Sequence, residues 1–233
     1  MAVRLGAPRQ SWRDVVLEAK EAPERVARVY TRLAPVYEAW ARATESKSRR
    51  RVLELASVRP GEDVLEVATG TGVQLVRLAR ANLGGRTVGV EISEGMLAQT
   101  RRRLERAGLT EEVEVIEGSA LELPIADESV DLLVNGYMLD LLPRDDIPRA
   151  LAEFKRVLRP GGRLVLSNMT KGERRRHRIW DWAYGRGFVL TANCRGVLAA
   201  PVLQELELIG VSREYLSQML FPTEIVTARK GDR

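Results

Sequence analysis

A short apolar run that ends directly in a glycine-rich turn constrains the fold of this chain more than any other feature. Residues 63–68 read Asp-Val-Leu-Glu-Val-Ala, which is typical of a buried strand, and Gly70 and Gly72 follow at once. Helical spacing of apolar residues then begins over Val73–Arg80. Because glycine lacks a Cβ, a ligand can approach this turn closely, and the first N–H groups of the helix are free to bind an anion. The segment predicts a strand, a ligand-binding turn and a helix.

Strands and helices continue to alternate after this turn. We expect strands at Thr87–Ile92, Val113–Glu117, Val130–Asn135 and Arg163–Ser167, and helices at Glu94–Ala107 and Asp145–Leu158. Two further strand-like runs, Ser212–Met219 and Ile225–Lys230, are joined across Phe221–Thr223 without a helix between them. Alternating elements form a parallel sheet, whereas the last two runs should form an antiparallel hairpin at one edge. The predicted fold class is α/β, a doubly wound, mostly parallel, seven-stranded sheet.

The end of the second strand indicates the class of ligand. Glu91 ends this strand, where a carboxylate can accept hydrogen bonds from the two hydroxyls of a ribose. A dinucleotide fingerprint requires a third glycine in the turn, and this chain has Leu75 there. The pattern therefore predicts an adenosyl ligand and argues against NAD.

Several motifs in this order resemble those of class I S-adenosylmethionine (SAM)-dependent methyltransferases. The resemblance is strongest to the ubiquinone/menaquinone-biosynthesis type of C-methyltransferase and related small-molecule methyltransferases. The motifs are Glu66–Gly72, Val90–Ser93, Gly118–Pro124 and Arg156–Leu164, and Tyr30–Tyr37 resembles the aromatic segment that precedes the core. The resemblance implies a Rossmann-like fold and an enzyme that uses SAM and releases S-adenosyl-L-homocysteine (SAH).

The resemblance also implies which residues bind SAM. Glu66 would lie near the methionyl amino group, Glu91 would bind the ribose, and Ile92 would pack on the adenine. Ser119 stands where an aspartate is common, so it would accept a hydrogen bond from the adenine amino group without a charge. Tyr30 and Tyr37 would close over the cofactor, although they could equally pack a helix onto the core. The implied cofactor site is Tyr30, Tyr37, Glu66, Ala68, Thr69, Gly70, Thr71, Gly72, Glu91, Ile92, Ser119, Ala120, Leu121, Asn135 and Gly136.

Methyl transfer is an in-line displacement in which the protein supplies orientation and a dry site, so no covalent protein intermediate and no metal are expected. Asn135 and Gly136–Met138 would face the transferring methyl group. His177 is the only histidine and is a candidate general base by pKa, but it lies in an arginine-rich stretch that reads as solvated. Asp140 is a rival candidate, for which a structural role is the alternative.

The chain divides into two expected parts. Residues 1–57 should form an N-terminal helical extension or lid, in which a helix over Ser46–Ser57 turns apolar side chains toward the core. Residues 58–233 should form the SAM-binding core, with an insertion near 171–200 as the substrate lid. The aromatic residues and basic run of 171–188 could bind a flat or anionic substrate or a membrane surface, or form a small helical cap.

Composition limits the partners and the location. The net charge is only +5 and acidic residues are interleaved throughout, so nucleic acid is not an expected partner. With one cysteine and no apolar run of membrane-spanning length, the chain is expected to be soluble and cytoplasmic. We expect a monomer or a homodimer. The predicted function is methyl transfer to a quinol-like, lipid-like or other small molecule. The alternatives are an RNA or protein methyltransferase and a non-catalytic binding module.

Overall fold

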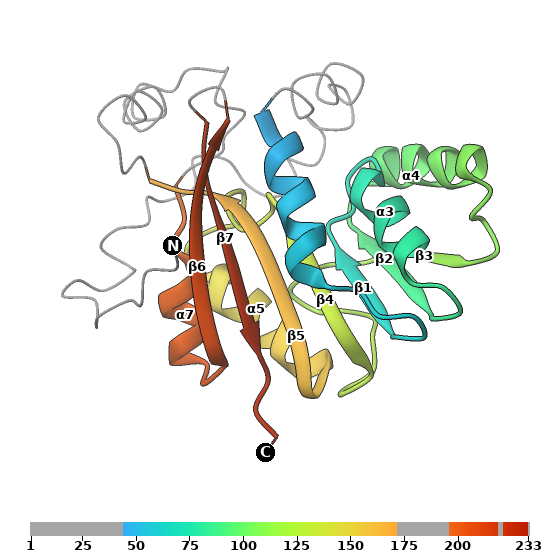
Figure 1. Ribbon diagram of the computed structural model, residues 1–233. Coiled ribbons are helices and arrows are strands. Elements are labelled where there is room, and N and C mark those ends of the chain that lie inside the picture. The colour runs from blue at the N-terminus through green and yellow to red at the C-terminus, as the bar shows by residue number, and fades with distance from the viewer. Residues whose placement is uncertain (1–43, 172–195, 219–220, 233) are drawn as a thin grey trace.

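The computed structural model describes residues 44–171, 196–218 and 221–232, which contain one twisted sheet with helices on both faces (Figure 1). Within these residues the strand order is β3-β2-β1-β4-β5-β7-β6. The strands are β1 Val64–Val67, β2 Thr87–Glu91, β3 Val113–Glu117, β4 Val130–Gly136, β5 Leu158–Met169, β6 Ile209–Gln218 and β7 Phe221–Arg229. β1 to β5 are parallel, and β7 runs antiparallel to both β5 and β6. The predicted α/β class and its edge hairpin are confirmed.

The helices cover the two faces of the sheet. They are α3 Val73–Ala81, α4 Glu94–Ala107, α5 Asp146–Val157, α7 Ala199–Glu205 and a helix over residues 44–56. Alternate residues of a strand point to opposite faces. Leu132 of β4 packs in a cluster with Val52 of helix 44–56, whereas its neighbour Leu133 packs in a cluster with Phe154 of α5. Helix 44–56 and α5 therefore lie on opposite faces.

Leu75, the residue that replaces the third glycine of a dinucleotide fingerprint, has a specific place in the fold. It is fully buried, and it lies against Gly89 of β2. A Cβ built on Gly89 would lie 2.7 Å from Leu75 Cδ2 and 2.7 Å from Thr69 Cγ2. The close approach of helix and strand is thus achieved with the glycine on the strand and the large side chain on the helix.

The fifth strand is longer than predicted. The sequence predicts a strand over Arg163–Ser167, after the turn-favouring pair Gly161-Gly162, but β5 begins at Leu158. Val130 pairs with Leu158 and Leu132 with Arg163, so the intervening residues form an irregularity within the strand. Gly161, with φ 73°, donates its N–H to the carbonyl of Lys230. Gly161 thus adopts the left-handed conformation that is typical of a turn, but strand pairing before and after it keeps the segment in the sheet.

The expected link between the last two strands is wrong. Phe221–Thr223 was predicted as the connection, but these residues begin β7. Thr223 pairs with Met169 on one side, Phe221 pairs with Gln218 on the other, and the carbonyl of Pro222 accepts a hydrogen bond from Thr170. Proline is tolerated near the start of a strand, so the turn signal of Pro222 was misleading.

Helix 44–56 is attached to the sheet by polar contacts as well as by Val52 and Ala56. Arg51 forms a two-point ion pair with Glu214 of β6, with both N–O distances 2.8 Å, and the N–H of Lys47 donates to Gln218. The predicted helix over Ser46–Ser57 is confirmed, but the proposed boundary at residue 57 stays a prediction, because residues 1–43 and 172–195 lie outside the described part. Within the described residues, no helix has the length and apolar character needed to cross a bilayer.

Candidate functional site

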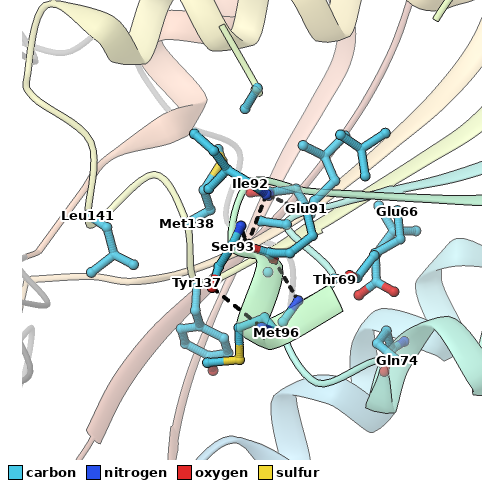
Figure 2. A pocket seen from close by; sticks show the side chains of 18 of the residues that line it. Glu66, Thr69, Gln74, Glu91, Ile92, Ser93, Met96, Tyr137, Met138 and Leu141 are labelled. Carbon is cyan, nitrogen blue, oxygen red and sulfur yellow. Dashed lines mark hydrogen bonds between the residues drawn. The ribbon is translucent and has the colours of Figure 1, made fainter. Parts of the chain in front are cut away.

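A cavity of about 430 Å³ lies at the carboxyl ends of the parallel strands, where ligands bind in open α/β sheets (Figure 2). It is lined by the ends of β1, β2 and β4, by the loops that follow the strands β1 to β4, and by residues of neighbouring helices. The predicted residues that line it are Glu66, Ala68, Thr69, Gly70, Thr71, Glu91, Ile92, Ser119, Ala120, Leu121, Asn135 and Gly136. The structure therefore brings together every described residue of the implied cofactor site except Gly72.

The turn after β1 depends on left-handed backbone conformations. Ala68, Gly70 and Gly72 have φ of 59°, 56° and 76°. A Cβ on Gly70 would meet nothing within 4 Å, which leaves this side of the turn open to a ligand. A Cβ on Gly72 would lie 2.9 Å from Thr100 Cγ2, so Gly72 is required by the approach of α4. The two glycines thus serve different purposes, one toward the cavity and one toward the core.

Glu91 organises this turn through its carboxylate. Its Oε2 accepts the N–H of Gly70 at 2.9 Å, and its Oε1 accepts those of Ile92 at 3.1 Å and Ser93 at 3.0 Å. Burial raises the pKa of Glu91, and these three hydrogen bonds oppose the rise. A carboxylate has about four acceptor positions, so roughly one remains on Oε2 for a ligand hydroxyl. To bind both ribose hydroxyls, Glu91 would have to accept the second hydroxyl at Oε1, which already accepts two backbone N–H groups.

Glu66 is the second buried carboxylate in the cavity. Only 4% of its surface is exposed, and its Oε2 has no hydrogen-bond partner among the described residues. Burial raises the pKa of Glu66 to about 8; nearby Arg49 opposes this rise and Glu91 adds to it. A buried carboxyl without a partner is costly to ionise, and a cationic ligand group would stabilise the ionised form. The site is therefore suited to an ammonium group.

The end of β4 and the residues that follow it form one wall of the cavity. Asn135 is fully buried and donates from Nδ2 to the carbonyl of Val67 at 2.9 Å, which fixes the end of β1. Tyr137 follows with φ 53°. Its hydroxyl lies 2.6 Å from Ser48 Oγ and 3.0 Å from Thr223 Oγ1. Since Ser48 donates to the carbonyl of Glu45, Tyr137 must donate to Ser48.

The Tyr137 hydroxyl connects helix 44–56, β4 and β7. We expect Tyr137→Phe to lower the free energy of unfolding by about 1–3 kcal/mol, because it removes two buried hydrogen bonds: Ser48 loses its donor and Thr223 loses its acceptor. Urea denaturation followed by circular dichroism measures this change. Thr223→Val removes only one of the two hydrogen bonds and should have a smaller effect. An unchanged unfolding midpoint for Tyr137→Phe would contradict this role.

The region expected to bind adenine is only partly built as predicted. Ile92 is 57% exposed and lies on the cavity wall, free to pack against a flat ring. Ser119 Oγ accepts the N–H of Leu121 at 3.1 Å, so part of its acceptor capacity is used within its own loop. A serine hydroxyl can accept a second hydrogen bond, and the predicted contact with an adenine amino group remains a prediction.

Asp140, the candidate general base that lies within the described residues, does not line the cavity. The chain bends at Tyr137, and Asp140 lies fully buried in the turn that follows. Burial also raises the pKa of Tyr137, so its phenol stays protonated. His177, Tyr30, Tyr37 and the segment 172–188 lie outside the described residues.

Several cavity walls were not predicted from the sequence. Arg49 and Val52 come from helix 44–56, Met96 from α4, and Ser167 from β5. Gln74, in the first turn of α3, also lines the cavity, as do Leu141, Leu142, Pro143 and Asp146. Gln74 carried a signal, because a polar amide stands there on an otherwise apolar helix face next to the glycine turn. The others are brought in by tertiary packing.

Comparison with known proteins agrees with this geometry. A family model described as "Methyltransferase domain" matches residues 64–162. Demethylmenaquinone methyltransferase of Symbiobacterium thermophilum is 31% identical over 175 residues, 73% of this chain and 69% of that protein. That of Listeria welshimeri is 35% identical over 154 residues, 64% of this chain and 63% of that protein. The solved 4+2 cyclase SpnF has a TM-score of 0.71 at 19% identity, covering 93% of this chain and 98% of its own, which shows a shared fold.

Proposed function

Because this chain belongs to the class I SAM-dependent methyltransferases, it is an enzyme, and we propose that its cavity binds SAM and delivers the methyl group to a small-molecule acceptor. The acceptor would lie above the ends of β4 and β5, on the side of Met138. A quinol-like ring is the first acceptor class to test, since the demethylmenaquinone methyltransferases match most of this chain.

The arrangement of Glu66 and Glu91 supports this proposal most strongly. Both carboxylates are buried and line the same cavity, and they lie at or next to the carboxyl ends of adjacent parallel strands. Glu66 suits a cation, and Glu91 retains acceptor capacity for a hydroxyl. SAM carries an ammonium group and a ribose. The unpartnered polar atoms of Glu66 and Thr69 in this cavity are what such a ligand would satisfy.

The residues on the opposite side of the cavity favour an apolar acceptor. Met138 and Leu141 lie away from Glu66 and Thr69 in Figure 2, and Leu142 and Pro143 extend this apolar wall. SAM supplies an electrophilic methyl group when bound. Apolar walls exclude water, which favours a reaction in which the positive charge of the sulfonium disappears. The protein's part is to hold the acceptor in line with the methyl group, which can supply roughly 7–11 kcal/mol of the barrier.

Calorimetric titration with SAH, followed by assays of methyl transfer from labelled SAM, tests this function. We expect saturable SAH binding with one site per chain and transfer to at least one member of a panel of demethylated quinols. Transfer only to RNA or protein fractions would replace the proposed acceptor class. Absence of SAH binding by the folded protein would remove the proposal altogether.

A further inference from the structure

Gln74 is a buried amide that lines the cavity at the start of α3. Its side chain lies in the first turn of α3, two residues after Gly72, and only 4% of the residue is exposed. Neither Nε2 nor Oε1 has a hydrogen-bond partner among the described residues. A buried amide without partners is destabilising, and such groups are rare unless a ligand satisfies them.

Gln74 faces the same end of the cavity as other unsatisfied groups. Glu66 Oε2 and Thr69 Oγ1 are also buried without partners in the described part of the chain. All three side chains line the cavity, and Figure 2 shows them on the side opposite Met138 and Leu141. Arg49, which lines the cavity as well, contributes positive charge near Glu66. This end therefore offers a carboxylate, a hydroxyl, an amide and a nearby guanidinium.

A ligand that satisfies these groups must carry, at one end, both a positively charged hydrogen-bond donor and a negatively charged hydrogen-bond acceptor. Glu66 requires a cationic donor, whereas Thr69 and the Nε2 of Gln74 can donate to an anion. An amide is the side chain that can serve both, because Oε1 accepts and Nε2 donates. A free α-amino acid group, with its ammonium and carboxylate on one carbon, has this chemistry.

We propose that Gln74 is a specificity-determining residue that recognises the amino-acid end of the cofactor. This inference rests on the proposed function, in which the same cavity binds SAM. Gln74 makes the site select ligands with an intact amino-acid group over ligands that share only the adenosyl thioether. Glu91 and Ile92 bind the part that both kinds of ligand share.

Titration with SAH and with 5′-methylthioadenosine separates these two contributions. The latter retains the adenosine and the thioether but lacks the amino-acid group. We expect Gln74→Met, which keeps the length of the side chain, to weaken SAH binding roughly 10- to 100-fold, as for loss of hydrogen bonds to charged groups. Binding of 5′-methylthioadenosine should stay within about twofold of wild type, because its contacts lie elsewhere.

Thermal unfolding of the ligand-free protein distinguishes this role from a structural one. Gln74→Met removes an unsatisfied buried amide, so its melting temperature should rise by about 2–4 °C. Asn168→Ala is the matched control. Asn168 is a fully buried amide in β5, also without a partner among the described residues, but it does not line the cavity. SAH binding by Asn168→Ala should equal that of wild type.

The outcomes are distinct. Weakened SAH binding with unchanged 5′-methylthioadenosine binding supports the inference. Equal weakening of both ligands, or a lowered melting temperature of Gln74→Met, would show that Gln74 supports the fold and would overturn it. Unchanged binding of both would also overturn it. If wild-type protein binds neither ligand, the proposed function itself has failed.

Discussion

Glu91→Ala should weaken SAH binding by roughly 100-fold or more and lower the free energy of unfolding of the ligand-free protein by ~2–4 kcal/mol. The variant loses the acceptor for the ligand hydroxyl and leaves the N–H groups of Gly70, Ile92 and Ser93 without their carboxylate. Water from the cavity can replace part of this loss, which keeps the expected destabilisation below the sum of three bonds. Calorimetric titration and urea denaturation measure the two effects.

Glu117→Ala is the matched control for Glu91→Ala. Glu117 ends β3 and pairs in register with Glu91, but it is exposed and does not line the cavity. Its removal should leave SAH binding and stability near wild type. Glu91→Gln, which retains one acceptor oxygen, should fall between the two. If folded Glu91→Ala bound SAH with wild-type affinity, this carboxylate would stabilise the turn but would not bind the ligand.

Glu66→Gln should weaken SAH binding by roughly 10- to 100-fold and abolish the proton release that accompanies binding to the wild type. With a pKa of about 8, Glu66 is protonated in about nine-tenths of ligand-free molecules at pH 7. An ammonium group beside it lowers this pKa and expels the proton. Wild-type affinity should therefore rise from pH 6 to pH 8, by at most about tenfold per pH unit. Titrations in buffers of different ionisation enthalpy count the released protons.

Stability against pH provides an independent check on Glu66. Its pKa in the folded protein is raised above its ordinary value of 4.5, so the folded protein binds more protons than the unfolded chain between pH 4.5 and 8. The free energy of unfolding should therefore fall as the pH rises through this range. Glu66→Gln should lack this part of the slope. A wild-type protein that binds SAH without proton release would contradict the assigned protonation state.

The regular elements were predictable because their sequence patterns are local. β3 and α4 have the predicted bounds, Val113–Glu117 and Glu94–Ala107, since an apolar run and a terminal glycine mark their ends. The predicted starts of β5 and β7 were wrong. Gly161 and Pro222 are local turn signals, but pairing with neighbouring strands keeps both residues within the sheet. Strand pairing depends on residues far away in the sequence, which a local pattern does not contain.

The cofactor end of the site was predictable for the same reason, whereas the other walls were not. Glu91 ends β2, while Glu66 and Gly70 lie just before and just after the end of β1, and the carboxyl ends of parallel strands meet at one edge. Asp140 lies only a few residues beyond β4, but it is fully buried in the turn that follows the strand and does not line the cavity. Arg49 reaches the cavity only because helix 44–56 docks on the sheet, which the sequence alone does not orient.

Because helix 44–56 docks on the sheet, the smallest fragment that keeps the cavity intact is longer than the segment that matches the family model. That segment begins at residue 64, yet Arg49 and Val52 form part of the cavity wall, and Arg51 and Ser48 anchor their helix to β6 and Tyr137. A shorter fragment that starts at β1 would expose the apolar surface of Leu78, Leu132 and Val165 and leave the ligand end of the molecule open to solvent. Expression boundaries for biophysical work therefore belong upstream of Thr44.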